Sequence, residues 1–159
     1  MKILALETSA KSVSCAVVED GAPLASAYQC TGLTHSRTLL PMVDAMLKNA
    51  DLTLDDINAI AIAAGPGSFT GIRIGISAAK GFCGALKKPS LGITTFQTLA
   101  YNAEGECLAA VPAGRGFYYV CAFGEDKRVL GEPARTDGEG LFALAQKYAV
   151  VSYGDLPVP

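Results

Sequence analysis

The sequence has few of the residues from which catalytic centres are usually built. It contains one histidine, His35, no tryptophan, and five cysteines without a C-x-x-C pair. A single imidazole provides neither a metal cluster nor a charge-oriented dyad without further donors, which favours a capping or surface role for His35 over catalysis. No Ser-His-Asp or Cys-His pattern and no acid–base pair of carboxylates can be recognised. The sequence therefore predicts no catalytic residue and no metal ligand.

Charge is also scarce. Only 18% of the residues are charged, 50% are hydrophobic, and the net charge is −2. This is too apolar for a disordered chain and too interrupted for a membrane span, so we expect a soluble, globular protein without membrane contact. The negative charge disfavours a direct grip on a phosphate backbone, so any contact with RNA is expected through a partner. Ile3–Leu6 is too short for a signal-peptide core, which predicts a cytoplasmic protein.

The cysteines form an odd set, and most of them lie in apolar, strand-like surroundings. In a reducing compartment such residues behave as small hydrophobes, an interpretation favoured over a disulfide or metal role. They are Cys15, Cys30, Cys83, Cys107 and Cys121.

Hydrophobic periodicity predicts a strand meander, a helix and a further strand in the first half. Asp20-Gly21 favours a tight hairpin turn. Leu39, Leu40, Val43, Met46 and Leu47 recur at the spacing of one buried helix face, with Pro41 in the first turn or at a kink. The predicted elements are strands at 2–7, 13–19 and 24–30, a helix at 36–50, a strand covered on both faces at 59–64, a helix at 70–86, a strand at 91–93 and a helix at 95–103.

The second half repeats this order. The expected elements are strands at 107–111, 117–123 and 128–130, a helix at 140–148 and a strand at 150–153. An internally duplicated β-β-β-α-β unit is the plan of the actin, Hsp70 and sugar-kinase superfamily. We therefore predict an α/β fold with two lobes of the β-β-β-α-β-α-β-α type, the first at 1–104 and the second, incomplete, at 105–159.

A glycine-rich loop, Gly65-Pro-Gly-Ser-Phe-Thr-Gly-Ile-Arg73, joins the apolar strand to the following helix. Its glycines permit positive φ or close backbone approach, so a tight strand-to-helix turn is favoured. A phosphate-binding loop is the alternative, but the Lys-Ser/Thr ending of a Walker loop is missing and Pro66 removes a backbone donor. The candidate loop residues are Gly65, Pro66, Gly67, Ser68, Phe69, Thr70 and Arg73.

The helix at 70–86 is too apolar for an ordinary surface helix. Its polar side chains Arg73, Ser77 and Lys80 cover an arc of only about 60°. Small residues recur four apart along it, which allows another helix to come close. One interpretation packs this row inside the chain itself. The favoured one predicts a partner interface formed by Gly71, Ile74, Gly75, Ala78, Ala79, Phe82, Leu39, Val43 and Met46.

This interface is expected to form a two-fold homodimer in the isolated protein, because a self-complementary apolar patch tends to close by C2 symmetry. A Gly75→Leu variant is expected to block the partner helix while leaving the fold largely intact.

Glu7-Thr-Ser-Ala-Lys-Ser12 stands where kinases and ATPases of this superfamily carry an acidic residue and a phosphate-binding turn. The usual glycine pair is missing, which makes phosphate approach less easy. Glu7, Thr8 and Ser9 are therefore candidates for nucleotide proximity, with a turn-stabilising role for Glu7 as the alternative.

Four segments carry a specific resemblance to a known family. Leu4–Ser9, His35–Pro41, Asp56–Ile60 and Gly65–Arg73, the last followed by Ala79-Lys-Gly81, resemble the TsaB (YeaZ) family. The resemblance is thinner past residue 105, where the family's second-lobe pattern is kept mainly at Arg115, Gly116 and Tyr119.

The resemblance implies an accessory, non-catalytic scaffold of the machinery that installs threonylcarbamoyl on adenosine 37 of tRNA. The implied partners are a TsaD-type catalytic paralogue and a TsaE-type ATPase, with tRNA contacted indirectly. The paralogue carries two metal-ligating histidines where this chain has Thr95 and Leu99. No cofactor is therefore expected on the isolated chain, while ATP or ADP and a divalent metal are expected only in the assembled complex. The alternatives are a glycoprotease-like (M22) metallopeptidase and a small-molecule kinase of the actin superfamily.

Overall fold

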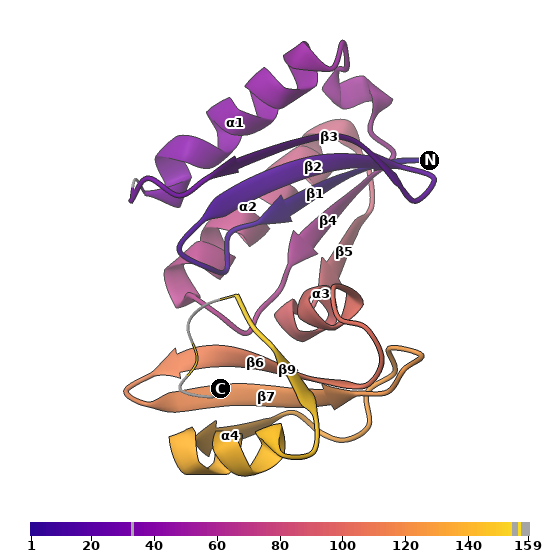
Figure 1. The fold of residues 1–159 in the computed structure, drawn as a ribbon. Coiled ribbons are helices and arrows are strands. Elements are labelled where there is room, and N and C mark those ends of the chain that lie inside the picture. The colour runs from indigo at the N-terminus through magenta and orange to yellow at the C-terminus, as the bar shows by residue number, and fades with distance from the viewer. Residues whose placement is uncertain (33, 154–155, 157–159) are drawn as a thin grey trace. The chain divides into compact units, whose positions relative to one another are not determined.

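The computed structural model describes residues 1–32, 34–153 and 156, and its internal contacts divide the chain into two units, Met1–Ile93 and Thr94–Pro159 (Figure 1). The boundary therefore lies after Ile93 and not at the predicted 104/105. Helix α3 (Thr95–Tyr101) belongs to the second unit because its side chains Phe96 and Ala100 are buried against strands of that unit.

The first unit contains a five-stranded sheet in the order β3-β2-β1-β4-β5. Its predicted strands are confirmed, with β3 shifted by one or two residues. Asp20 and Gly21 adopt φ values of 50° and 86°, as a tight hairpin between β2 and β3 requires. The strands are β1 (Lys2–Glu7), β2 (Val13–Glu19), β3 (Ala22–Gln29), β4 (Ala59–Ala63) and β5 (Ser90–Ile93).

Two helices, α1 (His35–Asn49) and α2 (Phe69–Leu86), pack on one face of this sheet and share one hydrophobic core with it. Both were predicted to within one residue at each end. Pro41 lies inside α1, beyond its first turn. Leu40 departs from the predicted buried face, because its side chain is 51% exposed. The two helices thus cover the same side of the sheet and leave a flank of α1 open to solvent.

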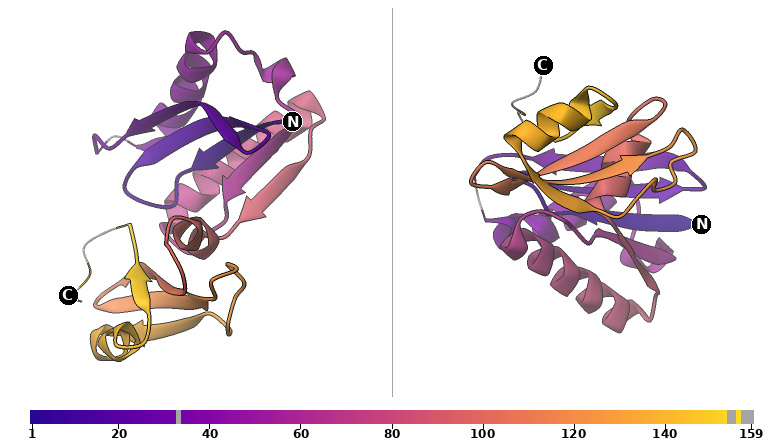
Figure 2. Two further views of the ribbon diagram at one scale, coloured as in Figure 1. Left: turned by 45° about the vertical axis from the view of Figure 1, so that its right-hand side comes forward. Right: turned by 90° about the horizontal axis from the view of Figure 1, so that it is seen from below.

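The second unit contains a four-stranded sheet in the order β8-β7-β6-β9, which repeats the order of the first four strands of unit one. Helix α4 (Gly138–Ala145) precedes its last strand. Figures 1 and 2 show α3 and α4 on opposite faces of this sheet. The strands are β6 (Cys107–Gly114), β7 (Phe117–Phe123), β8 (Ala134–Asp137) and β9 (Ala149–Val151).

The strand predicted at 128–130 is wrong. Val129 forms only an isolated bridge with Phe123, because Lys127 has a φ of 61° and the chain turns back on itself, with the Gly124 N–H donating to the Arg128 carbonyl. The third strand of this meander is β8, in which Arg135 pairs with Tyr119. A short apolar run predicts a strand but does not show whether a neighbouring strand is there to pair with it.

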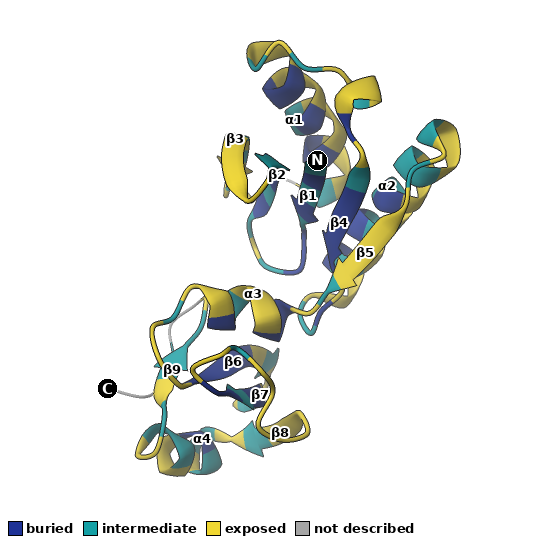
Figure 3. Ribbon diagram, turned by 90° about the vertical axis from the view of Figure 1, so that its right-hand side faces the viewer, coloured by how far each residue is buried: buried dark blue, intermediate teal, exposed yellow. Residues whose placement is uncertain are grey.

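Burial differs between the sheets, as Figure 3 shows. In β6, Cys107 to Val111 are all buried, since α3 covers one face and α4 the other. Three cysteines, Cys15, Cys107 and Cys121, are buried as predicted, whereas Cys30 is exposed. Among the described residues, no helix is both long enough and apolar enough to cross a membrane.

Candidate functional site

The loop after β1 and the glycine-rich loop before α2 lie against each other. The Thr8 hydroxyl donates to the Gly71 carbonyl at 2.8 Å, and the Ser68 N–H donates to the Ser9 carbonyl at 2.7 Å. The Glu7 carboxylate accepts a hydrogen bond from the Ser9 N–H, which is the turn-stabilising role considered for it. Thr8 and Ser9, predicted to lie near a nucleotide, are almost fully buried beneath the chain's own loop and helix.

His35 joins the same loop from the start of α1. Its Nε2 lies 2.8 Å from the Ala10 carbonyl, so with Nε2 protonated the imidazole ties the N-terminal turn of α1 to the β1–β2 loop. This is a structural contact and not a helix cap, since no side-chain capping hydrogen bond is formed at the start of α1.

The glycine-rich loop makes a tight strand-to-helix turn, as the favoured interpretation predicted. Gly65 has a φ of 95°, and the Gly65–Pro66 peptide bond is cis. A Cβ on Gly67 would stand 2.5 Å from the Ser9 carbonyl oxygen, so this position needs glycine for close approach of the two loops. Ser68 caps α2, with its hydroxyl accepting from the Gly71 N–H at 3.2 Å. The loop thus sets the orientation in which α2 packs against the sheet.

The small-residue row of α2 faces its own sheet, which corrects the prediction that it meets a partner. A Cβ on Gly71 would stand 2.0 Å from the Thr8 carbonyl oxygen, and one on Gly75 would stand 2.3 Å from the Thr8 Oγ1. Ala79 is also buried, within the same core as Ile62. These three residues let α2 approach β1 and β4, so they are not available to another molecule.

The predicted interface residues on α1 need the same correction. Leu39, Val43 and Met46 are 1%, 2% and 5% exposed and pack in the core of the first unit. Their helical spacing correctly predicted a buried face, but that face is turned toward the sheet.

A different surface between the two helices remains accessible. Phe69 is 69% exposed, and the Arg73 guanidinium carbon lies 3.8 Å from the centre of its ring, a cation–π contact. Together with Leu40 these side chains border a mostly apolar groove of about 680 Å³, here named the α1/α2 groove. It is lined by Ser36, Leu39, Leu40, Phe69, Thr70, Arg73, Ile74, Ser77, Ala78, Gly81 and Phe82.

The predicted interface residues Ile74, Ala78 and Phe82 do line this groove. Sequence reasoning missed Leu40 as an exposed residue, because its place in the apolar repeat assigned it to the core. The exposed Phe69 was predicted only as part of the loop. An apolar groove flanked by an arginine is suited to binding a complementary protein surface.

No group of three or more His, Cys, Asp or Glu that could hold a metal ion occurs in the part of the chain that the structure describes. Thr95 is buried and Leu99 partly buried on α3. Burial raises the pKa of the Cys15 thiol to about 11, so that this thiol stays protonated in the folded protein near neutral pH.

The two sheets with one repeated strand order define an α/β protein of the actin, Hsp70 and sugar-kinase-like class. Residues 29–148 match the family model described as TsaD, tRNA N6-adenosine threonylcarbamoyltransferase. Among the relatives of this chain, those named TsaB or YeaZ reach 33–38% identity, and the chain belongs to the TsaB (YeaZ) family.

Individual comparisons agree with this assignment. The tRNA threonylcarbamoyladenosine biosynthesis protein TsaB of Escherichia coli is 35% identical over 142 residues, which are 86% of this chain and 61% of that protein. The solved structure of YeaZ from Pseudomonas aeruginosa is 33% identical with a TM-score of 0.77, covering 87% of this chain and 68% of that one. This chain thus spans about three fifths of the length of the Escherichia coli relative.

A more distant structure shows the fold alone. The activator of the 2-hydroxyisocaproyl-CoA dehydratase from Clostridium difficile, solved with bound ADPNP, is 12% identical with a TM-score of 0.54 over 92% of this chain and 53% of that one.

Proposed function

We propose that this chain is a non-catalytic partner of a TsaD-type catalytic subunit in the N6-threonylcarbamoyladenosine modification of tRNA. The observation that carries the proposal is the α1/α2 groove, a largely apolar surface at which Leu40 and Phe69 are 51% and 69% exposed. Family membership supports the pathway, since relatives are named as threonylcarbamoyladenosine biosynthesis proteins.

The accessory role is supported by the packing of the β1–β2 loop. In kinases of this fold class that turn must be open for a phosphate to approach. Here the Ser9 carbonyl is engaged by Ser68, and Gly67 lies against Ser9. We therefore expect the isolated chain to bind Mg-ATP weakly and to acquire ATP or ADP and a divalent metal only in the assembled complex. We expect a TsaE-type ATPase to complete that cytoplasmic complex. This chain then contacts tRNA only through the other proteins of the complex.

The α1/α2 groove also accounts for the proposed homodimer. Two copies can close over it by two-fold symmetry, and the catalytic paralogue then displaces one copy by presenting a related surface. The small-residue row plays no part in this contact, since it lies inside the first unit.

A charge in the groove tests the proposal. Leu40→Glu replaces a side chain that is 51% exposed, so the fold should survive while a desolvated carboxylate opposes the partner. We expect binding to the TsaD-type subunit, measured by calorimetry, to weaken by at least about tenfold. Ala85→Glu is the matched control, because Ala85 is exposed on α2 and does not line the groove. If both variants bound the TsaD-type subunit with equal affinity, the α1/α2 groove would not be part of the interface.

The pathway needs a separate experiment. Cells depleted of their own TsaB are supplied with this chain, and threonylcarbamoyladenosine is measured in their tRNA. Restored modification is expected. A tRNA that stays unmodified, despite normal binding of the catalytic subunit, would contradict the proposed function of this chain.

A further inference from the structure

The two edges of the first sheet differ in how well they are protected. Natural sheets commonly blunt their edges with short strands, lysine or proline, because an unpaired edge accepts additional strands. The β5 edge has four residues and directly follows Lys87-Lys-Pro89. The β3 edge has eight residues, Ala-Pro-Leu-Ala-Ser-Ala-Tyr-Gln, and no charge. Pro23 and a bulge at Leu24, which has no partner in β2, blunt only its beginning, which leaves Ala25–Gln29 as a free backbone edge.

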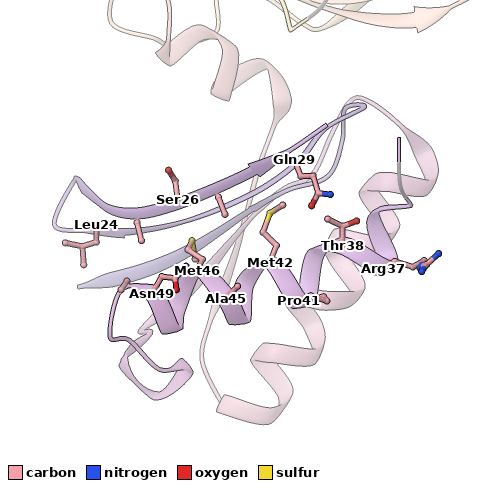
Figure 4. A pocket seen from close by; sticks show the side chains of 13 residues that line it. Leu24, Ser26, Gln29, Arg37, Thr38, Pro41, Met42, Ala45, Met46 and Asn49 are labelled. Carbon is pink, nitrogen blue, oxygen red and sulfur yellow. The ribbon is translucent and has the colours of Figure 1, made fainter. Parts of the chain in front are cut away.

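A groove runs beside this edge, between β3 and α1, with a volume of about 610 Å³ (Figure 4). Met42 and Met46 extend from α1 toward the strand in Figure 4. Ala25 and Ala27 on β3 pack against the core on the same side, because they pair with the buried Val17 and Cys15. The floor is therefore apolar and has room for medium-sized side chains. None of its lining residues borders the α1/α2 groove.

The two ends of this β3/α1 groove differ in charge. Arg37 stands at the end near Gln29, as Figure 4 shows, and its side chain is exposed. Arg37 takes part in none of the ion pairs found among the described residues. Leu24 and Asn49 at the other end carry no charge. A ligand with one acidic group at the Arg37 end would complement this distribution.

The geometry points to a binding site for an extended peptide segment of a partner protein, which adds to β3 as an antiparallel strand. Backbone hydrogen bonds to the free edge hold the segment, and alternate side chains enter the β3/α1 groove. In antiparallel pairing the N-terminal end of the segment lies beside Gln29. An acidic residue there, followed by small aliphatic residues at alternate positions, therefore matches Arg37 and the apolar floor.

A second copy of this chain fits the site less well. Two-fold antiparallel pairing of β3 with β3 would place the Arg37 end of one copy beside the Leu24 and Asn49 end of the other. No acidic residue lines the groove, so neither arginine would meet a carboxylate from the groove lining of the other copy. The charge distribution thus favours a separate peptide.

The probe is the capped hexapeptide Glu-Thr-Val-Thr-Val-Thr, which directs its glutamate and both valines to one side. Titrated into the isotope-labelled full chain, it should perturb amide NMR signals along β3 and the facing side of α1, and should slow hydrogen exchange at the β3 edge. Glu-Thr-Val-Pro-Val-Thr is the control peptide, because proline removes one backbone donor and resists a strand. If both peptides bind equally, strand addition is refuted.

Charge reversal tests the orientation. Arg37→Glu should weaken the peptide by about threefold to tenfold, and a peptide with lysine in place of glutamate should recover the loss. Ala45→Glu, in the exposed wall of the groove, should weaken both peptides, whereas Ala85→Glu on α2 should leave both unchanged. Unchanged binding to Ala45→Glu, or no rescue by the lysine peptide, would overturn the site.

Sedimentation measurements test the alternative that a second copy of this chain pairs with the β3 edge. A dimer that survives Leu40→Glu but dissociates in Ala45→Glu or on addition of the peptide would assign the β3 edge to self-association, and would overturn the proposed occupant. A monomeric Leu40→Glu variant that still binds the peptide supports it. Because the two grooves share no lining residue, these results are independent of the TsaD-binding test.

Discussion

The two units share an element order but use their helices differently. Along β2 of the first unit, burial alternates, with Val13, Cys15 and Val17 buried and the residues between them only half-buried. Along β6 of the second unit, Cys107 to Val111 are buried without interruption. The difference arises because α1 and α2 lie on one face of their sheet, whereas α3 and α4 cover opposite faces of theirs.

This comparison shows that a repeated topology does not repeat its surfaces. Side by side on one face, α1 and α2 leave one groove between them and another along β3, and both grooves are accessible. In the second unit, α3 and α4 instead cover the two faces of the sheet. Binding surfaces are therefore expected on the first unit, and the following variants examine the packing on which that expectation rests.

The largest effects are expected in the doubly covered sheet. Phe123 faces α3 and Leu108 faces α4, and both are almost fully buried. Phe123→Ala should lower the free energy of unfolding by about 3 to 5 kcal/mol and Leu108→Ala by about 2 to 5 kcal/mol, because each leaves a cavity. Urea unfolding followed by circular dichroism measures both. A negligible effect of Leu108→Ala would mean that the α4 face is not packed, which contradicts the comparison.

A smaller loss is expected where α2 meets its sheet. In Gly75→Ala the new Cβ would stand 2.3 Å from the Thr8 Oγ1 and 2.6 Å from the Ile62 Cδ1. Overpacking of this kind should lower the free energy of unfolding by about 1 to 3 kcal/mol, and the larger Gly75→Leu should impair folding itself. Gly84→Ala is the matched control, since nothing lies within 4 Å of its Cβ position. That variant should gain up to about 1 kcal/mol through helix propensity. If the two alanine variants were equally stable, the conclusion that Gly75 packs against the sheet would be wrong.

Neighbouring valines test the one-sided covering of the first sheet. Val17 is fully buried under the helices, and Val18 points to the other face, where it is half-buried. Val17→Ala should cost about 1.5 to 3 kcal/mol, and Val18→Ala less than about 1 kcal/mol. The measurement is the midpoint of urea unfolding at an unchanged slope. Similar losses at the two positions would show that the second face is covered as well.

The last effect is confined to alkaline pH and arises because Cys15 is buried in the same core. Its pKa is raised to about 11 from an ordinary value of 9.0 by desolvation. Above pH 9 the unfolded chain therefore loses this proton while the folded chain keeps it, so stability falls as pH rises from 9 toward 11. The loss should reach about 1.4 kcal/mol near pH 10 and be missing from the pH profile of Cys15→Ala. Parallel profiles of the two proteins would contradict it.

Local patterns in the sequence determined most of the elements of this protein. The β-prone runs at Lys2–Glu7 and Val13–Glu19, the Asp20-Gly21 turn and the helical spacing of Leu39, Val43 and Met46 are local features that depend on near neighbours in the chain. They predicted the strands and helices of the first unit, the repeated order and the family. The strand predicted at 128–130 failed because strand pairing is a non-local choice, and β8 supplied the partner instead.

The tertiary structure decided which side of α2 is available to a partner. The spacing of Gly71, Gly75 and Ala79 predicts that something comes close, but a helical pattern is defined only around the helix's own axis. It does not say whether the neighbour is the sheet of the same chain or another molecule. Thr8 and Ile62, far away in sequence, occupy that side, and the accessible side is therefore the groove bordered by Leu40 and Phe69. Which faces meet is settled only when segments distant in the sequence pack together, because burial depends on all of them at once.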